Sequence, residues 1–415
     1  MLMSLCVIML SGLLLGWICK KIRFPSLFGM IIAGIIIGPY ALNLIDQSVL
    51  DVSSDIRRIA LIVILIRAGL KLDLSDLKKV GRPAVLMCFV PACFEIVGMV
   101  VLAPILLNIS FLDAAIMGAV IGAVSPAVIV PRMIKLIDEE YGTDKGIPQM
   151  ILAGTSVDDV FVIVMFTTFT GLAQGGEVSI LRFLNIPVSI VTGIIVGLIA
   201  GFLFVKWFSK IDIRATVKAI IVLSVSFALW AFEDSFKMVP FASLIAIMAI
   251  GIGIKKWGSH YAKELSGKYD KMWAVAEIFL FVLVGASVAI DSAVSAGVSA
   301  IILVLGVLVF RMVGVFVCIL GTKLSMKEKL FCMIAYTPKA TVQAAIGGLP
   351  LAMGLPCGQI VLTVSVIAIL LTAPLGAFGI DLTYQKLLKC RKNDESANDK
   401  RSKVLNRKIN QFNGA

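Results

Sequence analysis

The chain has 415 residues, of which 59% are hydrophobic and 15% charged, and its mean hydropathy is +1.01. Soluble proteins contain about 45–50% apolar and about 25% charged residues. The composition therefore excludes a soluble globular protein and a disordered one, and it predicts a protein that crosses the membrane many times. The single histidine, His260, excludes a histidine metal cluster and a Ser–His–Asp triad.

Apolar runs divide the chain into about 13 segments of membrane-crossing length. We therefore expect an all-α polytopic membrane protein with a transmembrane domain over 1–384 and a basic cytoplasmic tail over 385–415. The eight cysteines form no CxxC pair, so we interpret them as small buried hydrophobes. The segments lie at roughly 2–19, 25–45, 56–72, 84–107, 111–134, 148–173, 183–205, 215–232, 239–254, 272–290, 295–321, 328–352 and 358–384.

Basic residues distinguish the two sides of the predicted membrane domain. They gather in the loops after odd-numbered segments, whereas the loops after even-numbered segments contain only Arg57, Arg58, Arg182 and Lys237. Because basic loops stay in the cytoplasm, the N-terminus is predicted outside and the C-terminus inside a cell membrane. The net charge of +12 thus marks cytoplasmic loops, and no nucleic-acid partner is expected. The first segment has no basic stretch before it and is interpreted as a retained helix.

Two segments share a hydroxyl residue followed by a mid-membrane proline. The fifth segment contains Ser125–Pro126 and the twelfth contains Thr337–Pro338. Proline removes a backbone N–H, so each helix is predicted to be interrupted there. Because the two segments are an odd number apart, they cross the bilayer in opposite directions. The pattern predicts inverted repeats with two broken crossing helices, which is typical of secondary transporters.

Several charges fall inside the predicted membrane, where each costs at least about 2.5–3.5 kcal/mol on insertion scales. Asp158 and Asp159 lie near the middle of the sixth segment. Adjacent helical residues point about 100° apart, so one carboxylate can face a water-filled cavity and the other a protein partner. Glu95 and Arg311 occupy related positions in the two repeats and are expected to form a structural ion pair. Lys339 is expected to pair with Asp158 or with the unwound backbone.

Asp159 is the predicted ion-binding residue, with Asp158 beside it. Removal from water disfavours the charged form of a carboxylate, so a proton can bind near neutral pH. We expect the hydroxyls of Ser125, Thr155 and Thr341, with unwound carbonyls, to complete an oxygen shell for a small hard cation. A cation and a proton then compete for one carboxylate, which is sufficient for exchange at an alternating-access site. The metal ion is transported Na⁺, and no resident cofactor is expected.

Glycines repeat at four-residue spacing on two segments. Gly193, Gly197 and Gly201 lie on the seventh segment, and Gly34 and Gly38 lie on the second. Such spacing lets neighbouring helices approach closely. We expect these glycines to serve packing within one protomer rather than a dimer contact.

Three motifs in this order resemble the cation–proton antiporter superfamily, and most closely its NHA branch of sodium/proton antiporters with an Asp-Asp motif. They are SPAVIVP (125–131), GTSVDD (154–159) and PKATVQAAIG (338–347). The likeness covers the chain to about residue 384. It implies a homodimer of 13-helix protomers, each with a dimerisation domain and a six-helix core domain that moves like an elevator. The core would include 84–173 and 295–384.

By the same resemblance, Asp159 carries the ion or proton. Asp158 matches a position that is Asn in electroneutral relatives and Asp in electrogenic ones. Arg311 stands where many electrogenic members carry lysine, and an arginine cannot release the second proton that a lysine can. This departure is compatible with one-for-one exchange, whereas Lys339 in the broken helix keeps the electrogenic alternative open.

The predicted function is secondary active exchange of Na⁺ or Li⁺ for H⁺, not enzymatic catalysis. A K⁺/H⁺ antiporter and a sodium-coupled organic anion carrier of related fold are the alternatives. An anion carrier would aim Arg311 and Lys339 at its substrate. An intramembrane aspartyl protease needs carboxylates that converge from separate helices, which the adjacent Asp158 and Asp159 do not. The expected partners are the ions, the lipid bilayer and a second copy of the chain.

Overall fold

The computed structural model describes residues 1–22, 24–72, 81–174, 180–211, 213–236, 241–288 and 290–390. Every regular element assigned within these residues is an α-helix. Each predicted segment corresponds to one helix or to one interrupted set of helices. The basic tail from residue 391 onward lies outside the described residues, as do Arg23, Lys78, Lys79 and Lys237.

The chain order of the helices follows the predicted segments. Up to the first break they are α1 (Leu2–Lys21), α2 (Ser26–Ile37), α3 (Gln47–Asp51), α4 (Ser53–Lys71), α6 (Arg82–Met87), α7 (Val90–Leu107) and α8 (Phe111–Ile121). Up to the second break they are α9 (Pro126–Asp138), α10 (Ile147–Gln174), α11 (Ile180–Phe208), α12 (Ala215–Ser235), α13 (Ser243–Trp257), α14 (Ser259–Ala286), α15 (Ile290–Cys318) and α16 (Met326–Ala335). The last three are α17 (Thr341–Ile346), α18 (Leu349–Ala352) and α19 (Gly358–Leu387).

Eight stretches of the described chain are long and apolar enough to cross a membrane. The five other predicted segments fall outside this group. The helices of two of them, α2 and the interrupted set α16 to α18, are short, and α4, α13 and α14 have reasons of their own. Five charged residues lie in α4, α13 has only 15 residues, and α14 begins with a charged stretch before its apolar half. These three helices pack against one another, with α4 in contact with both α13 and α14.

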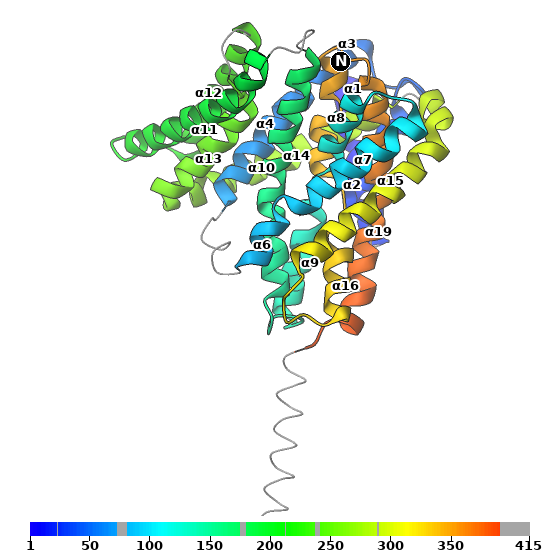
Figure 1. The fold of residues 1–415 in the computed structure, drawn as a ribbon. Helices are drawn as coiled ribbons and strands as arrows, with labels where there is room; N and C mark the ends of the chain where they lie inside the picture. The colour runs from blue at the N-terminus through cyan, green and yellow to red at the C-terminus, as the bar shows by residue number, and fades with distance from the viewer. Residues whose placement is uncertain are drawn as a thin grey trace, which may run out of the picture.

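The helices form two sets that lie side by side. α11 packs along α13, and these helices and α12, drawn in green, lie on one side in Figure 1. α7 packs along α15, and α16 packs on α19, on the other side. The N-terminus of α1 and the end of α19 lie at opposite ends of the assembly (Figure 1), as an odd number of crossings requires.

Both predicted helix breaks are present. α8 ends at Ile121 and α9 begins at Pro126, where a proline in the first turn loses no helical hydrogen bond. α16 ends at Ala335, and Pro338 lies in the unwound stretch before α17. The backbone N–H of Ser125 donates to the carbonyl of Pro338 at 2.8 Å, so the two unwound stretches touch. The prediction of two broken, crossing helices is confirmed.

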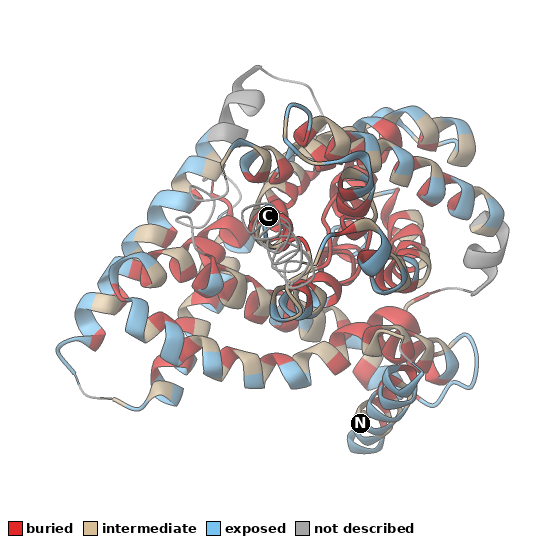
Figure 2. Ribbon diagram, turned by 90° about the horizontal axis from the view of Figure 1, so that it is seen from below, coloured by how far each residue is buried: buried red, intermediate tan, exposed pale blue. Residues whose placement is uncertain are grey.

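Glycines bring the helices of one protomer close together. A side chain at Gly197 would collide with the backbone carbonyl of Ala246 on α13, and one at Gly34 would collide with that of Val282 on α14. The expected packing within one protomer is therefore confirmed. Figure 2 shows buried residues on the faces turned toward other helices, with exposed residues outside. The outer face of α11 is apolar, with Ile195 and Ile199 about half exposed, as a helix in contact with lipid requires.

Candidate functional site

The crossing of the two broken helices lies against the middle of α10, where it meets Asp158. Oδ2 of Asp158 accepts hydrogen bonds from the backbone N–H of Val124 at 2.8 Å and from Nη2 of Arg311 at 3.0 Å. Asp158 is completely buried, whereas Asp159 keeps 8% of its surface exposed. The two adjacent carboxylates thus have different surroundings, and Asp158 is the one that faces a protein partner.

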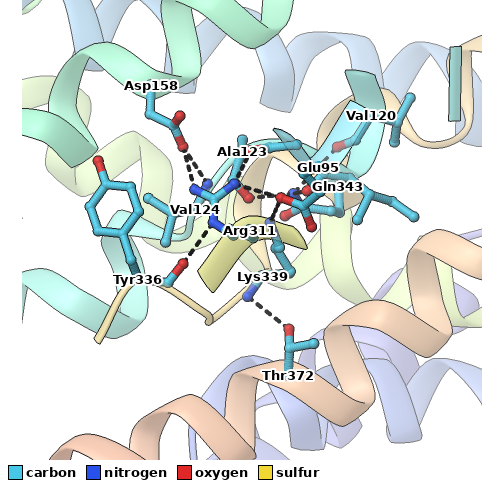
Figure 3. Close-up of polar contacts among 12 residues, drawn as sticks. Glu95, Val120, Ala123, Val124, Asp158, Arg311, Tyr336, Lys339, Gln343 and Thr372 are labelled. Carbon is cyan, nitrogen blue, oxygen red and sulfur yellow. Dashed lines mark hydrogen bonds and ion pairs between the residues drawn. The ribbon is translucent and has the colours of Figure 1, made fainter. Parts of the chain in front are cut away.

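Arg311 connects the parts of the site. Its Nη1 donates to Glu95 on α7 at 2.6 Å and also to the carbonyl of Gly122, while its Nε donates to the carbonyl of Tyr336 at 2.7 Å. One guanidinium thereby binds two carboxylates and a carbonyl from each helix break (Figure 3). The expected ion pair between Glu95 and Arg311 is present, and it belongs to a larger network that includes Asp158.

Lys339 occupies a different place from the expected one. The expected pairing of Lys339 with Asp158 or with the unwound backbone is wrong, because its Nζ lies 2.5 Å from Oε2 of Glu95. Oε2 of Glu95 thus accepts hydrogen bonds from both Lys339 and Arg311. The backbone N–H of Lys339 donates to Thr372 on α19 at 2.9 Å, which fixes the unwound stretch (Figure 3).

Gln343 joins the two broken helices, and the sequence prediction did not single it out. Its Nε2 donates to the carbonyls of Ala123 at 2.8 Å, Ile121 at 3.1 Å and Val120 at 3.3 Å. These carbonyls end α8 and have no helical partner of their own, so Gln343 on α17 caps the other broken helix. The signal in the sequence was an amide inside the apolar run ATVQAAIG, which must find partners when it is buried.

The predicted hydroxyl residues divide into two kinds. Thr155 donates its hydroxyl to the carbonyl of Ile151 in its own helix at 2.7 Å. By contrast, several buried oxygens at the crossing have no hydrogen-bond partner among the described residues. They are Oγ of Ser125, Oγ1 of Thr341, Oδ1 of Asp158, Oδ1 of Asp159 and Oε1 of Gln343.

The charges at the site do not balance. Asp158, Asp159 and Glu95 carry one negative charge each when ionised, and Arg311 and Lys339 carry one positive charge each, so one negative charge remains. Arg311 contacts both Glu95 and Asp158, and Lys339 contacts Glu95, which leaves Asp159 as the carboxylate without a basic partner in the described structure. A single monovalent cation or a single proton neutralises the site.

The chain is similar to proteins of one family. Residues 7–385 match the model described as "Sodium/hydrogen exchanger, transmembrane". The chain is 34% identical over 381 residues to Sodium/hydrogen exchanger 9B2 of Pongo abelii, which covers 88% of this chain and 70% of the relative. It is 31% identical over 409 residues to human Sodium/hydrogen exchanger 9B1, which covers 93% and 78%.

The fold is also similar to a solved structure. The sodium proton antiporter MjNhaP1 from Methanocaldococcus jannaschii at pH 8 matches with a TM-score of 0.78 and 22% identity, over 92% of this chain and 97% of that chain. Its likeness supports the all-helical fold. The family match covers nearly all of the described helices, including both broken ones and α10. This multi-pass membrane protein therefore belongs to the family of transmembrane sodium/hydrogen exchangers.

Proposed function

We propose that this protein exchanges Na⁺ or Li⁺ for H⁺ across the membrane by alternating access, with both ions competing for Asp159. The observation that carries the proposal is the single uncompensated carboxylate at the crossing of the broken helices. Oxygen atoms of Ser125, Thr341 and Asp158 in the same region are free to accept a cation. Hard cations prefer such oxygen ligands. Because the site has room for one positive charge, binding of a cation excludes the proton and binding of the proton excludes the cation.

An anion carrier fits the site less well. The two deep basic groups, Arg311 and Lys339, are fully buried and are already held by Glu95 and Asp158. An anionic substrate would have to displace a carboxylate from each of them. The adjacent Asp158 and Asp159 support membership in the branch that has an Asp-Asp motif. The names of the 9B relatives support sodium and protons as the ions exchanged.

We also propose that residues 84–173 and 295–384 form the mobile core and that the other transmembrane helices form the scaffold and dimer interface. The packing of α7 on α15, of α8 on α7 and α10, and of α16 on α19 supports a core that moves as one body. Arginine at position 311 stays charged throughout the cycle. One cation for one proton at Asp159 is then the simplest stoichiometry.

Purified protein in liposomes with an acid interior and a pH-sensitive dye tests the function. With the membrane potential clamped, external Na⁺ and Li⁺ are expected to raise the internal pH, and K⁺ is not. A response to K⁺ would change the ion but keep the site. No response to any of the three from folded protein would contradict antiport and favour a sodium-coupled solute carrier.

The site is tested with matched variants in the same liposomes. Asp159→Asn is expected to abolish exchange while the protein still inserts and purifies. Asp234→Asn is the control, because that aspartate lies near the end of α12 and its side chain accepts a hydrogen bond from Trp230. Sodium-driven proton movement in Asp159→Asn at the rate of the control would contradict the assignment of Asp159.

A further inference from the structure

Arg57 makes an unusual contact at the start of α4. Its Nε donates to the carbonyl of Ser53 at 3.3 Å, but its buried Nη1 has no hydrogen-bond partner among the described residues. The end of the guanidinium instead approaches Gly348, where an added Cβ would be 2.7 Å from Nη1 and 3.3 Å from Cζ. A side chain at this position would push the end of Arg57 away, so glycine allows the close approach.

The contact joins the two sets of helices that the proposed function moves against each other. Arg57 belongs to α4, which packs on α13 and α14 of the scaffold. Gly348 lies between α17 and α18, which pack on α19 in the core. Since α17 also carries Thr341 and Gln343 of the ion site, Gly348 must move with the site. The contact cannot persist through a complete transport cycle.

The packing of the broken helices shows which end of the site this contact closes. α17 packs on both α4 and α14, whereas the extensive contacts of α9 and α16 are with α10, α15 and α19, all within the core. Core and scaffold thus meet at the end where α4 begins, through Arg57 and Gly348, whereas the helices that α9 and α16 chiefly pack on belong to the core. The predicted orientation places the joined end outside and the other end in the cytoplasm.

We propose that Arg57 is a positioning residue that latches the core to the scaffold at Gly348 and so stabilises the state in which the outer side is closed. The proposal rests on the alternating-access function proposed above. Contact with Gly348 holds the latch closed, while the missing hydrogen bond at Nη1 keeps it weak, since a buried donor without a partner is unfavourable. A latch that must open in every cycle benefits from both properties.

Cross-linking tests whether the contact has to open. In Arg57→Cys/Gly348→Cys, a short bifunctional methanethiosulfonate reagent should join α4 to the core and reduce sodium-driven proton flux at least about tenfold, and a reducing agent should restore it. Lys71→Cys/Asp270→Cys is the matched control, because these residues form an ion pair between two scaffold helices. The wild-type chain treated with the same reagent controls for native thiols. Flux that continues at the uncross-linked rate in fully linked Arg57→Cys/Gly348→Cys would overturn the proposal.

A second measurement separates a latch from a simple structural role. Loss of Arg57 should populate the outer-open state, so Arg57→Ala should lower the sodium concentration for half-maximal exchange in right-side-out vesicles and raise it in inverted vesicles, by about threefold or more. Gly348→Ala should shift both values in the same directions, and Arg58→Ala should shift neither. Equal changes on both sides, or no change, would overturn the latch. If wild-type protein fails to respond to Na⁺ or Li⁺ at all, the proposed function fails instead.

Discussion

Arg311 is the residue on which the buried charges of the site depend most. It contacts Glu95, Asp158 and the unwound backbone of both broken helices. Breaking a buried ion pair by removing one partner costs about 3–5 kcal/mol, because the other charge stays buried and uncompensated. Arg311→Met is therefore expected to lower the free energy of unfolding by at least this amount, measured as thermal stability in detergent. Unchanged stability with lost transport would mean that Arg311 acts on the ion and not on the fold.

The pair formed by Glu95 and Lys339 can be tested by a double-mutant cycle. Glu95→Gln leaves the ammonium of Lys339 without its carboxylate and is expected to destabilise by about 3 kcal/mol or more. Glu95→Gln/Lys339→Met removes both charges and should recover at least about 1 kcal/mol of that loss. Melting temperatures of the two single variants and the double variant provide the coupling. Additive effects would show that the contact between Nζ and Oε2 of Glu95 contributes nothing.

At the residue scale, the sequence identified the charges more easily than their partners. Asp158, Asp159, Glu95, Arg311 and Lys339 stand out because ionisable side chains are rare in apolar runs. Which cation meets which carboxylate depends on how far the unwound stretches turn the backbone, and no periodic pattern encodes that. The ammonium of Lys339 consequently forms its ion pair with Glu95 and not with Asp158.

At the scale of elements, the two broken helices stabilise each other. Gln343 on α17 donates to three carbonyls at the end of α8. Gln343→Leu keeps the volume of the side chain but leaves these carbonyls buried without a donor, at a cost of about 1–3 kcal/mol. We expect a lower melting temperature in detergent together with slower exchange. Thr363→Val on α19 removes a hydroxyl that bonds only within its own helix and serves as the control. Equal stability of the two variants would contradict a cap between the broken helices.

A second contact between elements holds α4 to α14. Arg67 and Lys71 both bind Asp270, which lies just before the predicted segment 272–290. Partial burial opposes the shift, but the hydrogen bonds from Lys71 and Arg67 lower the pKa of Asp270 below its ordinary value. A lowered pKa adds stability above the ordinary value of about 3.9, and this stability is lost as the pH falls through the lowered pKa.

Asp270→Asn is therefore expected to reduce the free energy of unfolding by no more than about 1 kcal/mol, since the pair is partly exposed. The difference from wild type should stay constant between pH 6 and 8 and disappear only below about pH 4, as thermal melts across this range would show. A difference that changes between pH 6 and 8 would assign that titration to another group.

The breaks themselves could be predicted from the sequence, and the short helices around them could not. Pro126 and Pro338 cannot donate a helical hydrogen bond, so each marks an interruption whatever surrounds it. The end of α17 at Ile346 and the separate turn of α18 follow instead from Gly347 and Gly348, whose place against α19 and Arg57 is set by tertiary packing.

At the scale of the whole molecule, one fold combines an apolar exterior with a buried site that has one more acidic than basic group. Exposed apolar faces such as that of α11 suit either lipid or a second protomer, and the family resemblance favours a homodimer. Cross-linking in membranes followed by electrophoresis is expected to show a dimer whose yield does not depend on expression level. A monomer under all conditions would mean that the scaffold faces lipid on every side.

The orientation of the molecule is a further whole-chain prediction. The first residue of α1 and the end of α19 lie at opposite ends of the helix assembly (Figure 1), so the termini must be on opposite sides of the membrane. Basic loops such as the one with Lys255 and Lys256 predict which side is which, because positive loops remain in the cytoplasm. A fluorescent protein that matures only in the cytoplasm should fluoresce when fused to the C-terminus, and an N-terminal epitope should be reached by antibody on intact cells. Labelling of the N-terminal epitope only after permeabilisation would reverse the orientation, and the Arg57 contact would then close the cytoplasmic side.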